Sequence, residues 1–261
     1  STAVLLSGSG RIQEERISLT RFSGRVLTKI LTVFETEMNH EEKSPYSFIR
    51  KNCSYTDTLS RDGKGAQVKS GIGLIWSGFR PSDDSCRYGY LIPSNMFAVV
   101  VLNYLKEIAD FVGGKEEIAK KAEEMAKTVK QAIETYGTTH IWGLGDVYAY
   151  EVDGFGQYNL MDDANVPSLL AMSYLGYEPE SQEVADNTRK LILSEANPFY
   201  YSGTKAFRNR KSAHTGPLRM AHLQSHRGTD RTDKRGETSD DPRTDGNRRR
   251  YRTDARGCFR R

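Results

Sequence analysis

Two segments of the sequence place a pair of adjacent aspartates among aromatic residues. Asp83-Asp84 lies in segment 76–90, and Asp162-Asp163 lies in segment 148–167. Aromatic rings stack on the C–H face of a sugar, while carboxylates and amides bind its hydroxyl groups. Glycoside hydrolysis needs two carboxyl groups near each other with differently tuned pKa values. The two segments are therefore typical of a site that binds or cleaves a carbohydrate.

The acid pairs also have a simpler, structural interpretation. Asp83-Asp84 precedes a helix expected from Ser94, and Asp162-Asp163 precedes one expected from Pro167. Because helix N-termini favour acidic side chains, capping is the first interpretation of either pair taken alone. The acids of segment 153–163 also offer oxygen ligands for calcium, but their spacing does not match the twelve-residue calcium loop.

The remaining motifs indicate no metal, no cofactor and no serine nucleophile. Segment 8–10 lacks the Gly-Lys-Ser of a phosphate loop, and no Gly-x-Ser-x-Gly run is present. His222 and His226 have the spacing of a zinc pair, but Leu223 stands where a metalloprotease has its glutamate. Three cysteines are too few and too scattered for a disulfide scaffold or a cysteine-based zinc site. We therefore predict that the chain uses neither a metal nor a cofactor.

Apolar residues at three- and four-residue spacing predict a mainly α-helical chain. The expected helices cover about 21–39, 94–112, 118–136, a stretch that begins at Pro167, and 181–195. Segment 142–161 is rich in glycine and aromatic residues, and it predicts strands around a turn at Asp153–Gly156. Long structured loops in a compact domain are usually functional. The helices are therefore expected to position the two acid-containing segments.

The last 54 residues differ in composition from the rest of the chain. Residues 1–207 contain 22 Lys+Arg and 27 Asp+Glu, a net charge of −5, whereas residues 208–261 contain 16 and 7, a net charge of +9. From Leu218 onward there is no Ile, Val or Trp, so the segment cannot bury enough apolar area to offset the entropy of ordering it. We predict that residues 217–261 are disordered.

Three interpretations of this basic tail follow. An abrupt change to Arg, Gly, Thr, Asp and Ser is typical of a GC-rich gene translated out of frame, and this is the interpretation we favour. The second is a plain charged tail, and the third is a nucleic-acid-binding tail that uses Arg248–Arg250. Seven interspersed acids, with only Tyr251 and Phe259 to stack on bases, argue against nucleic acid as a partner.

The sequence gives no sign of a membrane segment. No apolar run reaches the 18 residues of a membrane-spanning helix, and Ser1–Gly10 lacks the basic start of a signal peptide. We therefore expect no membrane partner, and neither these features nor the cysteines set the compartment.

The loop motifs resemble those of a known enzyme family. The runs Trp76–Tyr90, Pro93–Val99 and Tyr148–Pro167 are similar to glycoside hydrolase family 125, the metal-independent exo-α-1,6-mannosidases. Shorter similar pieces are His40-Glu41, Ser44–Tyr46, Thr56–Leu59, Tyr174–Tyr177, Asn197–Tyr201 and Ala213–Gly216. The resemblance covers roughly Phe22 to Gly216.

This resemblance implies an (α/α)6 barrel that removes terminal α-1,6-linked mannose with inversion and without a metal. The implied partner is thus an α-mannoside glycan, and the implied general acid is one of Asp83 and Asp84, which the sequence does not distinguish. The implied substrate-binding residues are Trp76, Arg80, Ser82, Tyr88, Asn95, Asp153, Tyr158, Asn159, Asp162, Asp163, Asn165 and His214.

Two motifs of the family are absent from this sequence. The family's catalytic base is a glutamate in a His-Glu-Ser-Phe-like motif, but the glutamate after Gly216 is Glu237, in Gly-Glu-Thr. The N-terminal Trp-Leu-Arg-Asp-Ser-like motif is also missing, so the chain is expected to begin downstream of it.

We therefore predict an incomplete (α/α)6 barrel with long loops and a short β-hairpin over residues 1–216. A chain of this kind is expected to be inactive because it lacks the general base. The alternatives are a mannoside-binding remnant without turnover and a basic-tailed nucleic-acid binder.

Overall fold

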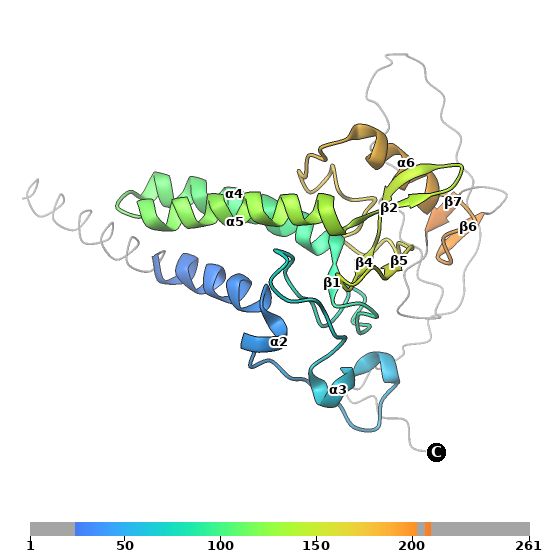
Figure 1. The fold of residues 1–261 in the computed structure, drawn as a ribbon, viewed down its shortest axis with the longest axis horizontal. Coiled ribbons are helices and arrows are strands. Elements are labelled where there is room, and N and C mark those ends of the chain that lie inside the picture. Colours follow the sequence, from blue (N-terminus) through green and yellow to red (C-terminus); the bar gives the residue numbers. More distant parts are fainter. Residues whose placement is uncertain (1–23, 203–206, 210–261) are drawn as a thin grey trace, which may run out of the picture. The chain divides into compact units, whose positions relative to one another are not determined.

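The computed structural model describes residues 24–202 and 207–209, and these residues form a mainly helical fold with a few short strands (Figure 1). Contacts divide the chain into residues 1–215 and 216–261, and all described residues belong to the first of these units. The predicted disordered tail lies outside the described residues. Beyond a helical stretch at 24–37, the helices are α2 (His40–Lys43), the 3-10 turn η1 (Tyr55–Asp57), α3 (Ser60–Gly63), α4 (Ile92–Val112), α5 (Glu116–Tyr136) and α6 (Gln182–Ile192).

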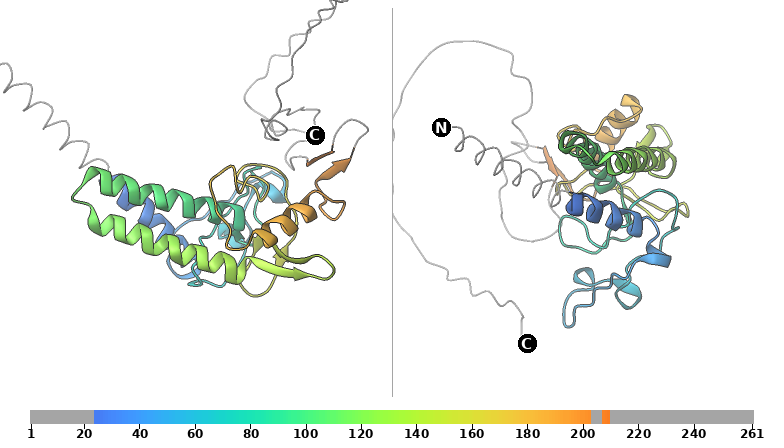
Figure 2. Two further views of the ribbon diagram at one scale, coloured as in Figure 1. Left: turned by 90° about the horizontal axis from the view of Figure 1, so that it is seen from above. Right: turned by 90° about the vertical axis from the view of Figure 1, so that its left-hand side faces the viewer.

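Helices α4 and α5 form an antiparallel pair, and residues 24–37 lie beside them (Figures 1 and 2). Gly113 and Gly114 allow the tight connection because both adopt positive φ angles, 75° and 65°. The buried face of α5 is rich in alanine, which lets the two helices approach closely. An ion pair of 2.6 Å between Lys121 Nζ and Glu35 Oε2 joins α5 to the stretch 24–37. The predicted helices over about 21–39, 94–112 and 118–136 are thus confirmed in outline.

Two antiparallel β-hairpins follow α5. Strand β2 (Thr138–Ile141) pairs with β3 (Gly145–Tyr148), and β4 (Glu151–Val152) pairs with β5 (Tyr158–Asn159). Strand β1 (Tyr90–Leu91) adds to β4, which gives the sheet order β1-β4-β5. The remaining strands, β6 (Tyr200–Ser202) and β7 (Phe207–Asn209), pair with each other.

The turn predicted at Asp153–Gly156 is confirmed, and Asp153 organises it. The carboxylate Oδ1 of Asp153 accepts hydrogen bonds from the backbone N–H groups of Phe155 at 2.7 Å and Gln157 at 3.0 Å. Short polar side chains often stabilise turns in this way. The other hairpin extends beyond the predicted strand region, because β2 already begins at Thr138.

Two predicted helix starts are wrong. Helix α4 begins at Ile92, and Ser94 is not its N-cap, because strand β1 runs directly into the helix and the Ile92 N–H donates to Tyr150 O at 2.9 Å. The stretch after Pro167 forms bends and turns instead of a helix. There the Asp162 carboxylate accepts from the Leu170 N–H, and Ser168 Oγ accepts from the Ala171 N–H. These side chains compete with the helical hydrogen bonds of the backbone.

The helix predicted over 181–195 is confirmed as α6. The Ser181 side chain accepts a hydrogen bond from the Val184 N–H, as an N-cap residue does. Among the residues that the structure describes, no helix is both long enough and apolar enough to cross a lipid bilayer.

Candidate functional site

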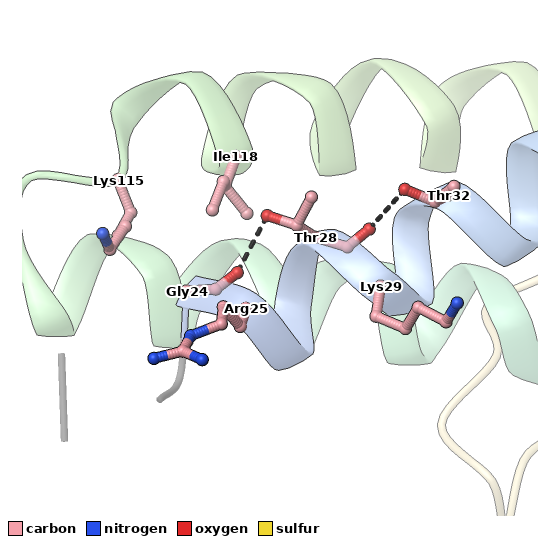
Figure 3. A pocket seen from close by; sticks show the side chains of 7 residues that line it. All are labelled: Gly24, Arg25, Thr28, Lys29, Thr32, Lys115 and Ile118. Atoms are coloured by element: carbon pink, nitrogen blue, oxygen red, sulfur yellow. Dashed lines mark hydrogen bonds between the residues drawn. The ribbon is translucent and has the colours of Figure 1, made fainter. Parts of the chain in front are cut away.

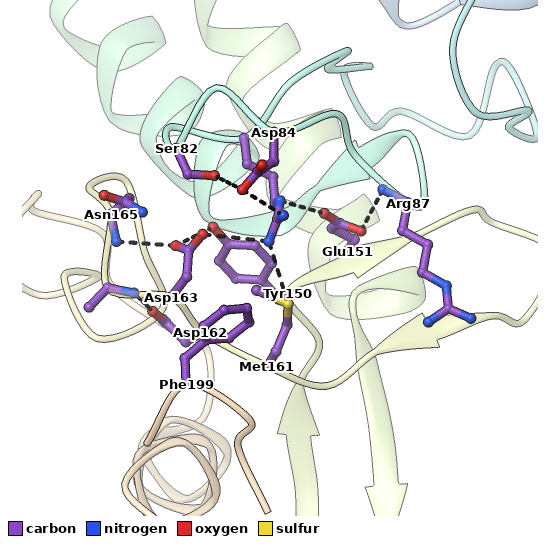
Figure 4. Close-up of polar contacts among 12 residues, drawn as sticks. Ser82, Asp84, Arg87, Tyr150, Glu151, Met161, Asp162, Asp163, Asn165 and Phe199 are labelled. Atoms are coloured by element: carbon purple, nitrogen blue, oxygen red, sulfur yellow. Dashed lines mark hydrogen bonds and ion pairs between the residues drawn. The ribbon is translucent and has the colours of Figure 1, made fainter. Parts of the chain in front are cut away.

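A largely buried arginine, with 12% of its side chain exposed, holds three carboxylates in one cluster. Arg80 Nη2 lies 3.0 Å from Asp84 Oδ2, Nη1 lies 3.5 Å from Asp163 Oδ2, and Nε lies 3.8 Å from Glu151 Oε1. Figure 4 shows the three carboxylates converging from two loops and strand β4. One guanidinium thus faces three acids in a site that is largely screened from water, which is where charges interact most strongly.

A tight loop aims Asp84 at the arginine. The Arg80 N–H donates to Asp84 O at 2.8 Å, and the Asp83 N–H donates to Arg80 O at 3.0 Å. Asp84 Oδ2 also accepts from the Ser82 hydroxyl at 2.8 Å. Asp83 takes a left-handed conformation, with φ of 68°, and its side chain is exposed. The loop therefore separates the two aspartates: Asp84 faces the cluster and Asp83 faces solvent.

Glu151, an acid that the resemblance places in the cleft as a sugar-binding or helix-capping residue, joins the cluster to segment 76–90. Its Oε2 accepts from the backbone N–H groups of Arg87 at 3.0 Å and Tyr88 at 3.1 Å, and from Asn159 Nδ2 at 3.1 Å. Its Oε1 and Arg80 Nε are buried and have no hydrogen-bond partner among the described residues. Burial raises the pKa of the Glu151 carboxyl above its ordinary value.

Asp162 and Asp163 are adjacent, but they do different things. Asp162 Oδ1 accepts from the Ala164 N–H at 2.6 Å and Oδ2 from the Leu170 N–H at 3.1 Å, so this residue shapes its own loop. Burial raises the pKa of Asp162 to about 6. Asp163 instead turns toward the arginine, and its Oδ1 accepts from the Tyr150 hydroxyl at 3.1 Å. Burial holds the pKa of Tyr150 well above its ordinary value, so the phenol stays protonated.

Neither acid pair caps a helix. No side chain makes a cap hydrogen bond at the start of α4, and the stretch after Pro167 is not helical. The capping interpretation of both pairs is therefore wrong. The acids are instead divided between loop formation, which is the role of Asp162, and the arginine cluster, which holds Asp84 and Asp163.

Two predicted substrate-binding residues lie in the interior. Trp76 is buried and stacks on His40, with ring centroids 3.6 Å apart. Asn95 bonds only to backbone: Oδ1 accepts from the Ile75 N–H, and Nδ2 donates to the carbonyls of Ile75 and Leu91. These two residues hold the start of the loop that carries Arg80.

The other predicted residues lie in or next to the cluster. Tyr88 and Asn159 are half-buried beside Glu151, while Tyr158, on β5, is more exposed. Asn165 is buried, and its Nδ2 has no hydrogen-bond partner among the described residues. His214 lies outside the described residues. The structure thus brings together Arg80, Ser82, Asp84, Tyr88, Asn159, Asp163 and Asn165, and it places Asp153 and Asp162 in supporting turns.

A separate groove of about 670 Å³ lies between residues 24–32 and the start of α5 (Figure 3). Its threonine hydroxyls are engaged within the helix, because Thr28 donates to Gly24 O and Thr32 donates to Thr28 O, each at 2.8 Å. The groove contains none of the residues that the sequence singled out for chemistry.

Comparisons with known proteins identify the family of this chain. The family of metal-independent alpha-mannosidases (GH125) matches residues 13–238. The Meiotically up-regulated gene 157 protein of Schizosaccharomyces pombe is 44% identical over 159 residues, which are 60% of this chain and 31% of that protein.

A solved structure is also similar. It is a Streptococcus pneumoniae member of a family of metal-independent α-mannosidases, in a non-productive complex with α-1,6-mannobiose. The TM-score is 0.68 at 42% identity, and the match covers 72% of this chain and 44% of the other. The chain therefore spans less than half the length of the relatives it matches. Because the family match covers most of its residues, this chain belongs to the GH125 family of metal-independent α-mannosidases.

Proposed function

We propose that the described residues form the acid side of an active site that removes terminal α-1,6-linked mannose with inversion. The observation that carries this proposal is the contact of Arg80 with Asp84, Glu151 and Asp163. The family match and the mannobiose complex of the similar solved structure support the substrate class. The resemblance adds the (α/α)6 barrel, of which the α4–α5 pair would form one antiparallel unit.

In this proposal Asp84 is the general acid. An inverting glycosidase places an acid beside the leaving oxygen and a base that activates water about 6.5–9.5 Å away. Asp84 is held toward the cluster by Arg80 and Ser82, whereas the Asp83 side chain is exposed. The resemblance assigns the base to a glutamate of a His-Glu-Ser-Phe-like motif, which these 261 residues do not contain.

The neighbours of Asp84 would bind and orient the sugar. Asn165 Nδ2 is buried without a partner among the described residues, so it is a ready donor for a sugar hydroxyl. Asp163, held by the Tyr150 hydroxyl and Arg80, offers an acceptor in the same place. Glu151 would act indirectly, by fixing the backbone of Arg87 and Tyr88 through hydrogen bonds.

Leaving-group dependence tests the role of Asp84. In a full-length protein that joins these residues to an in-frame His-Glu-Ser-Phe-like motif, Asp84→Asn should slow hydrolysis of α-1,6-mannobiose by about 10²–10⁴-fold. An aryl α-mannoside with a very acidic phenol needs no proton on its leaving group, so its hydrolysis should fall by less than about tenfold. Asp83→Asn is the matched control and should leave both rates within about tenfold of the unmodified protein.

Three other outcomes would change the assignment of Asp84 as the general acid. Equal losses on both substrates would mean that Asp84 maintains the loop and does not donate the proton. The leaving-group pattern in Asp83→Asn would move the acid to Asp83. Near-normal rates for both variants would remove the acid from this loop.

A further inference from the structure

His40, the first residue of α2, lies between two hydrogen-bond acceptors. Its Nε2 is 2.9 Å from the backbone oxygen of Lys64, and its Nδ1 is 2.7 Å from Glu37 Oε2. A carbonyl oxygen and an ionised carboxylate can only accept, so each contact requires a proton on the ring nitrogen. An imidazole that donates from both nitrogens is the charged form. Only 3% of the His40 side chain is exposed, and the described residues alone provide this burial.

Glu37 is the carboxylate that holds this charge. Its second oxygen, Oε1, accepts a hydrogen bond from the Ser44 hydroxyl at 2.7 Å, so both oxygens of the carboxylate are engaged. The other acid nearby, Glu41, is paired with Arg61 through two contacts of 2.7 Å. The end of the helical stretch 24–37 thus supplies the acceptor that keeps the proton on His40 Nδ1.

The charged ring of His40 lies flat on Trp76. The two ring centroids are 3.6 Å apart, and the ring planes differ by 10°. A cation over the face of an indole is attracted by its π electrons, and more strongly where water is excluded. The backbone adds a second link, because the Trp76 N–H donates to Glu37 O at 3.2 Å. His40 and Glu37 together therefore fix the position of Trp76.

Trp76 in turn contacts the loop that carries Arg80. Gly78 lies so close to the indole that a Cβ atom there would be 2.9 Å from Trp76 Cη2. The oxygen of the same glycine accepts from the Cys86 N–H at 2.9 Å, which closes the loop. An indole that moved away from His40 would press on this backbone and disturb the closing hydrogen bond.

We propose that Glu37 holds His40 as an imidazolium cation and that this cation positions Trp76 and the loop that follows it. His40 is thus a positioning residue, which acts through Trp76 on the loop of Arg80 and Asp84. Its consequence for catalysis rests on the proposed function. The charge of His40 and the order of the loop are properties of this chain and can be measured without substrate.

NMR of the ring nitrogens tests the charge. At neutral pH, His40 of the unmodified chain should carry a proton on both ring nitrogens. Glu37→Gln keeps the size of the side chain but removes its charge, so His40 should lose the proton on Nδ1. Ser44→Ala is the matched control, because it removes a hydrogen bond from the same carboxylate and leaves the charge, so both protons should remain.

Tryptophan fluorescence and hydrogen exchange test the effect on the loop. The sequence contains two tryptophans, so in a Trp142→Phe chain the emission comes from Trp76. An imidazolium quenches an adjacent indole more strongly than a neutral imidazole does, so Glu37→Gln should raise the emission and Ser44→Ala should not. The Cys86 amide should exchange at least about tenfold faster in Glu37→Gln, while the amides of α6 stay unchanged.

Three results would overturn the proposal. These are a single ring proton on His40 in the unmodified chain, an emission that Glu37→Gln and Ser44→Ala change equally, and faster exchange at Cys86 that α6 shares. The first result is decisive even if Glu37→Gln does not fold. A failed leaving-group test of Asp84 would remove the proposed function but would leave all three measurements, and the positioning by His40, unaffected.

Discussion

Burial determines the protonation of Asp162, and this makes a prediction about pH. Its pKa is raised from 3.8 to about 6, so the folded protein favours the neutral carboxyl. The resulting stabilisation is fully present below the ordinary pKa and is lost as the pH rises through about 6, by up to about 3 kcal/mol. Asp162→Asn should therefore lower the free energy of unfolding more at about pH 4 than at about pH 7.

Urea denaturation of the two proteins at both pH values measures this difference. The comparison between the variant and the unmodified chain cancels the titration of other groups, such as Glu151, which burial shifts in the same direction. A difference in the free energy of unfolding that does not change with pH would contradict the prediction. It would mean that Asp162 acts only through its hydrogen bonds to Ala164 and Leu170.

Arg80 is expected to be the most sensitive single residue of the cluster. Arg80→Met would leave Asp84, Glu151 and Asp163 without their shared cation, in a site where Glu151 and Asp163 are fully buried. Breaking a buried ion pair from one side typically costs about 3–5 kcal/mol of stability. Urea denaturation should show a loss of that size in the free energy of unfolding.

Lys121→Met is the matched control for Arg80→Met. Lys121 pairs with Glu35 at 2.6 Å, but both side chains are about half exposed. Exposed pairs contribute about 0–1 kcal/mol, so this variant should be nearly as stable as the unmodified chain. Similar losses in both variants would mean that the cluster is hydrated and that the carboxylates do not depend on the arginine.

For single residues, the sequence predicted which residues belong to the candidate site better than it predicted where their side chains lie. Arg80, Asp84 and Asp163 were predicted as site residues, and the structure brings them together, because a motif preserves residue identity. Glu151 was expected in the cleft, but its contact with Arg80 was not predicted, because the two residues lie far apart in the sequence. Trp76 was expected to contact substrate, but sequence does not reveal that its ring is buried on His40.

At the scale of elements, three glycines, Gly65, Gly78 and Gly89, lie against the Trp76 ring. A Cβ atom at Gly65 would lie 2.6 Å from Trp76 Cζ2, and one at Gly89 would lie 2.6 Å from Trp76 Cδ1. A contact this short forces the ring or the backbone to move. Gly65→Ala should therefore destabilise the protein and disturb the loop that leads to Arg80.

Gly114→Ala is the comparison variant for that contact. Gly114 also has a positive φ, 65° against 81° for Gly65, but its Cβ would meet nothing within 4 Å. Overpacking against Trp76 affects Gly65→Ala alone, which should therefore be about 1–3 kcal/mol less stable than Gly114→Ala. Thermal and urea unfolding measure the difference, and equal losses would show that the ring adjusts without cost.

Elements with a full amphipathic pattern were predicted best. Helices α5 and α6 follow from periodic apolar residues and from the Ser181 cap, which are local signals. The helix predicted after Pro167 is wrong because its leucines suggest a helix, whereas the Leu170 N–H donates to the Asp162 carboxylate, which lies before the stretch. A competitor that precedes the periodic stretch is not visible in the pattern of its apolar residues.

At the scale of the whole molecule, the chain spans only part of the length of its relatives. It spans 31% of the fission yeast relative and 44% of the pneumococcal structure. The mainly helical class was predictable because it follows from the periodicity of individual segments. The (α/α)6 barrel depends on how helices from the whole domain pair, so it stays a proposal for residues that contain one long antiparallel pair.

The last prediction is that these 261 residues alone do not turn over mannosides. Inversion needs an acid and a base on opposite sides of the bond, with room for a water molecule between the base and the sugar. The described cluster supplies the proposed acid, Asp84, and the sequence contains no His-Glu-Ser-Phe-like motif to supply the base. Glu151 is a poor substitute, because Oε2 is occupied by backbone amides and Oε1 faces Arg80.

The test is an assay of the purified chain at high concentration against α-1,6-mannobiose, with the pneumococcal mannosidase as the positive control. We expect no turnover above background, and turnover within about tenfold of the control would require a second catalytic carboxylate among the residues present. Titration with mannobiose by NMR separates the two remaining states of an inactive chain, because a binding remnant would shift the signals near Asn165 and an incomplete site would not. Sequencing the transcript through the codons for residues 200–220 would then locate the frame change that we infer for the basic tail, since a corrected frame should read into the missing glutamate motif.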